Sequence, residues 1–291
     1  MKKPLVSVLM TAYNREQYIE EAIESVLAST YTNFELIIVD DCSTDSTVAI
    51  IKSYGAKDSR IKVYENEKNL GDYPNRNKAA NYARGKYLKY LDSDDKILEH
   101  GLYEMVKAIE KYPEAAMAMM WVYDDSVNEP LLYSPETALR EYFIDNKWLL
   151  VGPSGCIYSK RIFFEIGGFS GRKYIGDFEF NMKAASTYPI VKMKNGLIFY
   201  RRHDAQQGNE ADHSHTYRTW QYKIQDETLN NPICQLNFVD KIVARKKIDR
   251  LQSRRVVFYF FKSLNFTRSI SIITKSGLGW KRFIKGLLSF K

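Results

Sequence analysis

The chain has 291 residues, of which 45% are apolar and 14% aromatic, enough to bury one large core or two small ones. Its cysteines, Cys42, Cys156 and Cys234, are odd in number and far apart, so neither a disulfide framework nor a zinc site is indicated and a reducing cytoplasm is favoured. No apolar run approaches the roughly 20 residues that span a bilayer, and the first residues lack the apolar region of a signal peptide.

The net charge of +8 is unevenly distributed along the chain. Residues 241–291 carry 14 Lys and Arg against one acid, whereas residues 1–240 carry 29 against 34 acids. Because the body has no excess of basic residues, we expect no nucleic-acid partner. The tail mixes its basic residues with aromatic ones over 256–262 and 280–291, a pattern typical of helices at an anionic membrane surface. The alternative is a pair of helices packed on the body, and both can hold.

The first 95 residues predict a repeated strand, loop and helix. Such alternation indicates an α/β fold with right-handed crossovers and a parallel or mixed sheet covered by helices on both faces. We expect Asn14 and Gln17 to cap the first helix and Gly85 to close the third. Strands are predicted at 5–10, 34–39, 61–64 and 87–91, and helices at 19–27, 48–54 and 75–84.

Residues 96–201 continue the alternation with less regular spacing. Between two of the elements, residues 130–155 form a loop-rich stretch in which Trp148 serves either as an aromatic platform of a sugar-binding cleft or as core. Residues 202–208 are predicted to form a mobile lid. The predicted elements are a helix at 96–112, strands at 116–123 and from 157, helices at 161–166 and 177–186, and a hairpin at 192–201 turning at Asn195-Gly196.

Three carboxylates, Asp92, Asp94 and Asp95, follow the predicted strand at 87–91. Negative charge crowded in this way needs a cation, protons or solvent to offset its repulsion. Ligands of open α/β sheets collect beyond the carboxyl ends of the strands. The pattern therefore predicts a metal and phosphate site, with a solvated acidic turn as the alternative.

Six short motifs occur in a fixed order between residues 4 and 205. They are Val8–Asn14, Val39–Asp45, Asn69-Leu70-Gly71 with Arg76-Asn77, Leu91–Asp95, Gly167-Gly168-Phe169 and Asp177-Phe178-Glu179. In this order and spacing they resemble the family 2 glycosyltransferases of the GT-A fold. The resemblance implies a Rossmann-like mixed sheet flanked by helices, here with a C-terminal basic helical extension. It divides the chain into a nucleotide-binding half (1–95), an acceptor-binding and catalytic half (96–215) and a basic, aromatic helical tail (216–291).

The resemblance also implies roles for residues of the first half. Ala12 and Tyr13 would hold the nucleoside, and Asp41, or Asp40, would accept a hydrogen bond from the uracil edge. Arg76 would reach the base or the diphosphate. A structural alternative for the two aspartates is a helix cap, a role for which Asp45 is better suited.

The same resemblance implies a metal site and a base. Asp92 and Asp94 match an aspartate-any-aspartate motif that grips the ribose and a Mn²⁺ or Mg²⁺ ion, since hard oxygen ligands suit both ions. Asp95 either joins them or caps the following helix. His203 resembles a histidine of the lid that lies near the metal, and the alternative is a plain surface histidine. Asp177 is the implied base.

The position of the base departs from the family pattern in one respect. The family has a Glu-Asp pair there, whereas this chain has Gly176 before Asp177, which leaves Glu179 as a substitute and a helix N-cap as the alternative role of Asp177. Gly176 is the one motif feature that favours a silent protein over an enzyme.

The resemblance implies an inverting, metal-dependent transfer of a sugar from a nucleotide-sugar, UDP-linked in our prediction, to a lipid-linked or glycan acceptor. Such an enzyme would build a surface polysaccharide from the cytoplasm, at the inner face of the membrane. One alternative is a catalytically silent nucleotide-sugar-binding partner recruited to the membrane by its tail. Another is a nucleotidyltransferase, which lacks support because no Walker-type phosphate loop is present.

Overall fold

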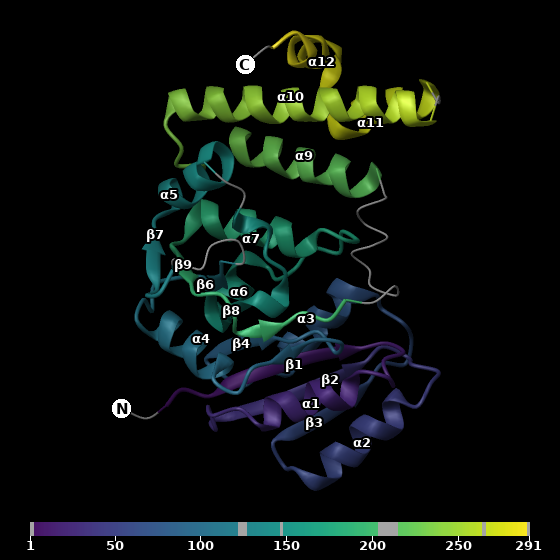
Figure 1. Cartoon of the computed structure of the whole chain (residues 1–291), viewed down its shortest axis with the longest axis vertical. Helices are drawn as coiled ribbons and strands as arrows, with labels where there is room; N and C mark the ends of the chain where they lie inside the picture. The colour runs from purple at the N-terminus through teal and green to yellow at the C-terminus, as the bar shows by residue number, and fades with distance from the viewer. Residues whose placement is uncertain (1–2, 122–126, 146–147, 203–214, 264–265, 290–291) are drawn as a thin grey trace.

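The computed structural model describes residues 3–121, 127–145, 148–202, 215–263 and 266–289. An α/β body carries a stack of helices at one end (Figure 1). Its main sheet has the strand order β3-β2-β1-β4-β8-β6-β9-β7, and β10 pairs with β5 in a small second sheet. The strands are β1 (Val6–Ala12), β2 (Phe34–Asp40), β3 (Ile61–Glu65), β4 (Tyr87–Tyr90), β5 (Lys96–Ile97), β6 (Met117–Met120), β7 (Leu131–Tyr133), β8 (Cys156–Ser159), β9 (Ile190–Met193) and β10 (Ile198–Phe199).

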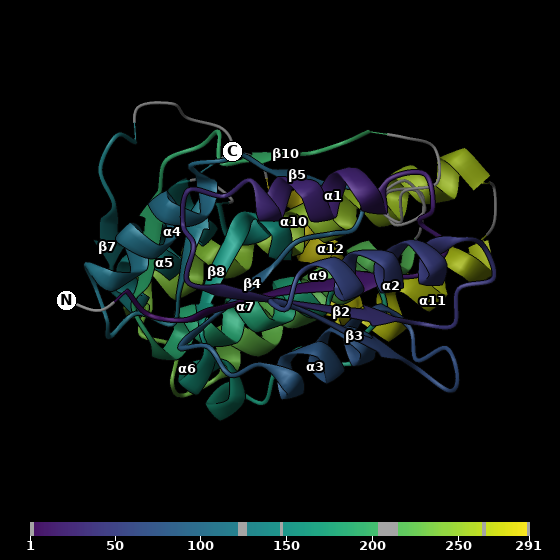
Figure 2. The ribbon, with the colours of Figure 1, turned by 90° about the horizontal axis from the view of Figure 1, so that it is seen from below.

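Helices cover both faces of the sheet. Figure 2 shows α1 and α2 on one side of β1 to β3 and α3 on the other. The α-helices are α1 (Ile19–Leu27), α2 (Thr47–Lys57), α3 (Asp72–Tyr82), α4 (Gly101–Glu110), α5 (Pro135–Arg140), α6 (Lys160–Ile166), α7 (Gly176–Thr187), α9 (His215–Asn230), α10 (Phe238–Ser263), α11 (Phe266–Ser276) and α12 (Gly279–Leu288), with short helical turns at Glu141–Asp145, Trp148–Leu150 and Pro153–Gly155.

The order of the strands creates a switch point between β1 and β4. β1, β2, β3 and β4 are parallel, but β2 and β3 lie on one side of β1 and β4 on the other. Their carboxyl ends therefore diverge around a crevice, the usual ligand position in open α/β sheets. β8 is antiparallel to β4 and β6, and β7 is antiparallel to β9. The predicted mixed sheet flanked by helices is confirmed.

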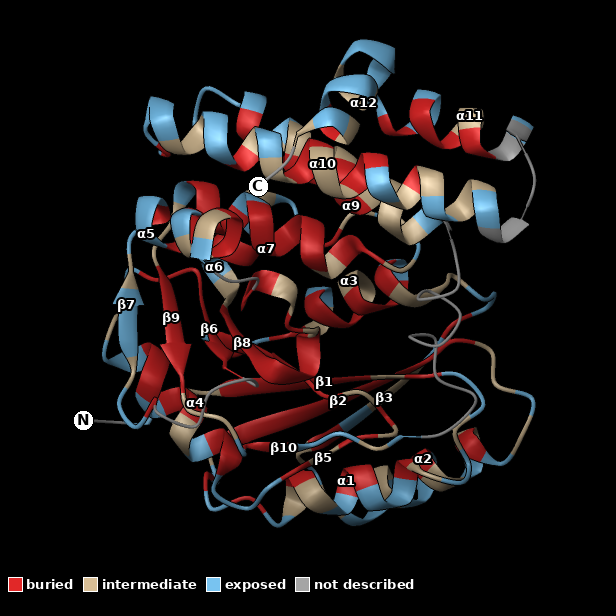
Figure 3. Cartoon of the chain, turned by 45° about the horizontal axis from the view of Figure 1, so that its top comes forward, coloured by how far each residue is buried: buried red, intermediate tan, exposed pale blue. Residues whose placement is uncertain are grey.

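Two apolar layers hold the body together, one on each face of the sheet. The first packs α1, α2 and α4 against side chains such as Val8 and Ile38, and the second packs α3, α6 and α7 against Leu9 and Tyr90. Strand residues alternate between the two layers because successive side chains of a strand point to opposite faces. Figure 3 shows the central strands buried throughout. The sheet runs without interruption from β4 into β8, across the predicted boundary at residue 95.

Trp148 belongs to the core. It is fully buried, its indole N–H donates to the Ala138 carbonyl at 3.4 Å, and its ring packs against Trp121 and Tyr133. Of the two interpretations, the aromatic platform is therefore wrong for this side chain.

Two predicted elements in the middle of the chain are wrong. Lys96 and Ile97 form β5 instead of opening a helix, and α4 begins only at Gly101. Asn195-Gly196 turns the chain with Gly196 at φ +73°, but no hairpin results. β9 pairs with β6 and β7, whereas β10 pairs with β5. Tertiary strand pairing thus overrides the local turn signal.

Two predicted helix ends are also wrong. Tyr18 is the N-cap of α1, without a side-chain hydrogen bond, and Asn14 adopts φ +52° and accepts from the Thr44 N–H at 2.8 Å instead. α3 spans Asp72–Tyr82, so Gly85 lies beyond its end. Gly85 is needed for space, because a Cβ there would lie 2.6 Å from the Ser7 nitrogen in the adjacent strand.

The tail forms a stack of helices on the body. α9 packs on α7, α10 packs on α9, and α12 packs on α10 at the end of the molecule opposite α2 (Figure 1). Arg282 anchors α12 by ion pairs with Asp249 at 2.5 Å and Asp226 at 2.8 Å. Packing on the body, one of the two roles expected for the tail, is therefore observed. Among the described residues, no helix combines the length and apolarity needed to cross a membrane.

Candidate active site

A cleft of about 690 Å³ opens at the switch point of the sheet. Ala12 and Tyr13 enter it from the end of β1, Asp41 from the end of β2, Arg76 from α3, and the acidic segment from the end of β4. Thus the residues assigned to the nucleotide by sequence, although distant along the chain, line one cleft. Tyr13 is 47% exposed there.

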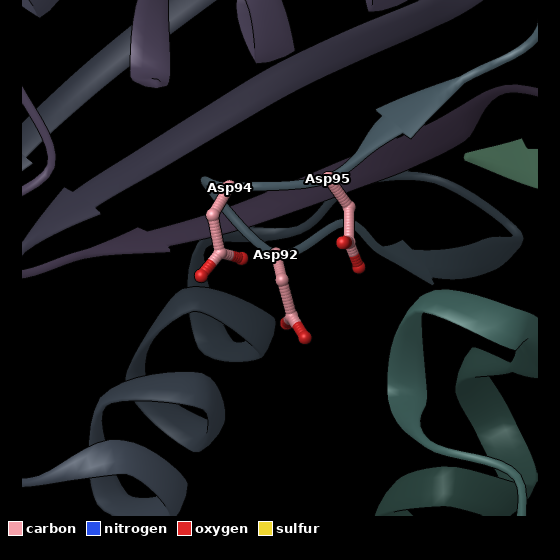
Figure 4. Close-up of side chains that lie close together, drawn as sticks. All are labelled: Asp92, Asp94 and Asp95. Carbon is pink, nitrogen blue, oxygen red and sulfur yellow. The ribbon is translucent and has the colours of Figure 1, made fainter. Parts of the chain in front are cut away.

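The acidic segment gathers three carboxylates. One carboxylate oxygen each of Asp92, Asp94 and Asp95 lies within 4.8 Å of the others, and Figure 4 shows the three side chains on the same side of the loop. Asp95 caps no helix, because α4 begins six residues later, and its Oδ1 accepts the Arg201 N–H at 3.2 Å. Burial, then the charges of Asp92 and Asp94, raise the pKa of Asp95 to about 7. Such a cluster is suited to a divalent cation.

Arg76 lies between two carboxylates. Its Nη2 is 2.8 Å from Asp92 Oδ1, and its Nε donates to Asp72 Oδ1 at 2.6 Å. Burial disfavours the ionised form of Asp92, but the charge and hydrogen bond of Arg76, with the charge of Lys89 and the hydrogen bond from Ser154, together outweigh it and hold the pKa of Asp92 below its ordinary value. Arg76 therefore shapes the acidic segment directly, a contact that the sequence did not predict. Within the described residues its Nη1 has no hydrogen-bond partner.

Lys89 and Ser154 support the acidic segment from below, and sequence reasoning missed both. Lys89 is fully buried, and its Nζ donates to the carbonyls of Tyr90, at 2.5 Å, and Ser154. The Ser154 Oγ accepts the Asp92 N–H at 2.9 Å. Burial lowers the pKa of Lys89 to about 8. The sequence feature that could have identified Lys89 is a lysine among the apolar residues of a strand.

Asp40 and Asp41 have different environments. The Asp40 carboxylate accepts from the Ser43 N–H at 2.8 Å and from its hydroxyl at 2.5 Å, closing the turn after β2. The Asp41 carboxylate faces the cleft and accepts from Asn66 Nδ2 at 2.7 Å and from the N–H groups of Leu70 and Gly71 at 2.8 and 2.9 Å. A carboxylate has about four lone-pair positions, so Asp41 retains one for a ligand.

Asp45 has the helix-end role expected of it. Its carboxylate accepts the N–H of Thr47, the first residue of α2, at 3.0 Å, and the Glu16 N–H at 3.1 Å. Asp45 thereby joins the loops that follow β1 and β2. Asp41, in contrast, lines the cleft.

Asp177 lies in the first turn of α7, in contact with Tyr73, which lines the cleft. Tyr73 Oη donates to Asp177 Oδ1 at 2.8 Å. Burial raises the pKa of Asp177 to about 6, near the value at which a general base is effective. Glu179, the substitute, is held by the Ser170 hydroxyl at 2.5 Å and by Lys183 at 3.0 Å. His203 lies outside the described residues.

Comparison with known proteins identifies the family. The model of glycosyl transferase family 2 matches residues 7–167. An uncharacterized glycosyltransferase of Methanocaldococcus jannaschii is 40% identical over 168 residues, 55% of this chain and 58% of that relative. TuaG of Bacillus subtilis, whose name proposes a role in teichuronic acid biosynthesis, is 50% identical over 94 residues, 32% of this chain and 37% of that relative.

The fold is similar to that of solved glycosyltransferases. Residues 1–349 of Staphylococcus aureus TarS, in a crystal structure with UDP, give a TM-score of 0.72 at 22% identity, covering 97% of this chain and 81% of that one. With its mixed sheet and the cleft at its switch point, the chain has the GT-A fold. The protein belongs to glycosyl transferase family 2.

Proposed function

We propose that the protein is an inverting glycosyltransferase that moves a sugar from a UDP-sugar to a lipid-linked or glycan acceptor of a surface polysaccharide. One observation carries the proposal: the carboxylates of Asp92, Asp94 and Asp95 converge in the same cleft as Tyr13 and Asp41. The UDP complex of TarS supports the choice of donor, and the name of TuaG supports a surface polysaccharide as product.

The donor set fits a divalent cation. Three carboxylates within 4.8 Å offer hard oxygen ligands, which Mn²⁺ and Mg²⁺ prefer over nitrogen and sulfur. In the proposal Asp92 and Asp94 hold the ion, Asp95 lies beside them, and His203 is a further candidate. When bound, the ion would act as a Lewis acid on the diphosphate leaving group.

The donor binds to residues at the ends of β1 and β2 and on α3. Ala12 and Tyr13 flank the nucleoside, and Asp41 uses its remaining lone pair to accept a hydrogen bond from the uracil N3–H. Arg76 has an unpartnered Nη1 within the described residues, a donor available to the diphosphate. Arg15 and Lys173 also line the cleft and add positive charge to it.

Asp177 performs the proton transfer. Its carboxylate takes the proton of the acceptor hydroxyl, whose oxygen forms a bond to the anomeric carbon. The bond from that carbon to the diphosphate oxygen breaks, and its electron pair leaves with UDP. Because the acceptor attacks opposite the leaving group, the configuration of the anomeric carbon is inverted.

A transfer assay of the full chain with radiolabelled UDP-sugars tests this proposal. Asp177→Asn keeps the shape of the base and removes its proton affinity, so we expect transfer to be lost while UDP binding persists. Retained transfer in Asp177→Asn would refute the assigned base. A thermal-shift panel of nucleotide-sugars with and without Mn²⁺ identifies the donor, because a bound ligand raises the unfolding temperature.

A second part of the proposal is peripheral attachment to an anionic membrane through α12. Its inner face carries Arg282 and Gly286, which pack on α10, whereas its outer face exposes Trp280, Ile284 and Leu288 by 50%, 53% and 68%. The apolar stripe thus points away from the body. Lys281 and Lys285 flank it and are exposed, and basic residues beside an apolar stripe suit anionic headgroups.

Sedimentation with vesicles tests the membrane surface. We expect the protein to bind vesicles that contain phosphatidylglycerol and not those of phosphatidylcholine alone. Replacing Trp280, Ile284 and Leu288 by alanine should abolish binding, whereas replacing the exposed Leu131 and Leu132 of β7 should not. Equal sedimentation of both variants would show that α12 is not the contact.

A further inference from the structure

We propose that Tyr73 is a positioning residue for the base, and that Gly176 is present because Tyr73 fills the space beside it. This inference rests on the proposed role of Asp177. Neither residue was singled out for such a role by its sequence motif, because the two segments are about 100 residues apart.

The contact is direct and enclosed. Tyr73 is the second residue of α3, is 5% exposed, and reaches across to α7, where its hydroxyl donates to Asp177 Oδ1 at 2.8 Å. Its ring packs against Phe169 with a centroid distance of 5.6 Å. The Phe178 N–H also donates to Oδ1, at 2.7 Å. Both hydrogen bonds therefore reach the same oxygen, which leaves Oδ2 to take the acceptor proton.

This arrangement leaves no space for a side chain at position 176. A Cβ at position 176 would lie 2.8 Å from two ring atoms of Tyr73 and 2.8 Å from the Ser170 carbonyl oxygen. Real Cβ contacts are not that short, so any side chain here forces the ring to move. The glutamate of the family's Glu-Asp pair cannot occupy position 176 while Tyr73 holds its present place. Tyr73 and the Ser170 carbonyl oxygen together thus account for the departure from the family pattern.

Tyr73 also couples the base to the donor cleft. The ring forms part of the cleft wall, and Arg76, one turn further along α3, contacts Asp92. One helix end therefore sets both the orientation of the base and the charge of the acidic segment. A phenol that keeps its proton can orient a carboxylate without competing for the acceptor proton, and burial raises the pKa of Tyr73 well above its ordinary value.

The neighbours of Asp177 determine its pKa. Burial raises its pKa, and the Tyr73 hydroxyl followed by the Phe178 N–H opposes this rise. Burial keeps the thiol of Cys156 and the phenol of Tyr158, both on β8, protonated by raising the pKa of each. The charged and titratable groups that face Asp177 are Asp72, Tyr73 and Arg76 from α3 and Cys156 and Tyr158 from β8.

Tyr73→Phe in the full chain tests the inference, because it removes the hydroxyl and keeps the ring. We expect turnover at saturating donor and acceptor to fall roughly tenfold, as for a lost hydrogen bond to a charged group. We also expect the acidic limb of the pH–rate profile to move up by roughly 0.5–1 pH unit. The dissociation constant for UDP should stay unchanged. Tyr82→Phe is the matched control on the same helix, since the ring of Tyr82 stacks on Tyr64 and packs against the core.

The outcomes separate this inference from the proposed function. If Asp177→Asn abolishes transfer but Tyr73→Phe leaves both turnover and the acidic limb unmoved, Tyr73 is only a structural residue and the inference is overturned. If Asp177→Asn transfers sugar normally, the base itself is misassigned. A lower unfolding temperature in Tyr73→Phe with an unmoved acidic limb would likewise overturn the positioning role.

Discussion

Arg76 Nη2 lies 2.8 Å from Asp92 Oδ1, a contact that joins α3 to the end of β4 at the lining of the cleft. The side chains of Arg76 and Asp92 are 10% and 33% exposed. Breaking a fully buried ion pair by removing one partner costs about 3–5 kcal/mol, because the other charge stays buried. We predict that Arg76→Met lowers the free energy of unfolding by somewhat less, about 2–3 kcal/mol, since water reaches part of Asp92.

Urea unfolding of Arg76→Met measures this cost, with Lys78→Met as the control on the same helix. Lys78 is half-buried and forms no ion pair with any residue that the structure describes, so its replacement should change the unfolding free energy by less than about 0.5 kcal/mol. Similar stabilities of the two variants would contradict the assigned contact.

We predict that the ionised side chain of Asp177 lowers the stability of the folded protein at neutral pH. Its pKa is about 6 in the folded protein against 3.8 in a model compound, so the folded state binds this proton more tightly than the unfolded chain does. Stability from this group is therefore present below about pH 4 and is lost as pH rises through 6. At pH 7.5, Asp177→Asn should raise the unfolding temperature, as often happens when an active-site charge is removed.

Thermal unfolding at two pH values measures this effect. The difference between Asp177→Asn and the wild type should disappear below about pH 3, where both side chains are neutral in both states. Glu136→Gln, an exposed carboxylate on α5, is the control and should leave the temperature unchanged. An unfolding temperature lower than that of the wild type at pH 7.5 would show that Asp177 is well stabilised in its charged form.

The packing of Gly176 against Tyr73 predicts strong non-additivity. Gly176→Ala should lower transfer activity because the new methyl group displaces the Tyr73 ring. In a Tyr73→Ala background the same substitution should cost less, since the ring is gone and only the Ser170 carbonyl oxygen still opposes the new methyl group. A double-mutant cycle on kcat measures the coupling, and effects that simply add would rule out the steric explanation.

Much of the cleft could be predicted from sequence because its residues follow strands. Ala12, Asp41 and Asp92 come at or directly after the ends of apolar runs, and the carboxyl ends of parallel strands meet at one edge of a sheet. The same reasoning places the acidic segment at the switch point. These predictions required only local pattern and one topological rule.

The supporting residues could not be predicted in the same way. Tyr73 and Asp177 are 104 positions apart, and Lys89 and Ser154 are 65 apart, so only the folded chain brings them together. The hairpin predicted at Asn195-Gly196 is wrong for a related reason. β5 has only two residues, too few to give a periodic signal, yet it pairs with β10 and prevents a hairpin.

Calorimetric titration of UDP into the protein, with and without Mn²⁺, tests whether the acidic segment binds the metal and the diphosphate. We predict UDP binding that depends on Mn²⁺, that is lost in Asp94→Ala, and that persists in Asp177→Asn. UDP binding of equal strength with and without Mn²⁺, or undiminished binding in Asp94→Ala, would contradict the assignment of the acidic segment as the metal and diphosphate site.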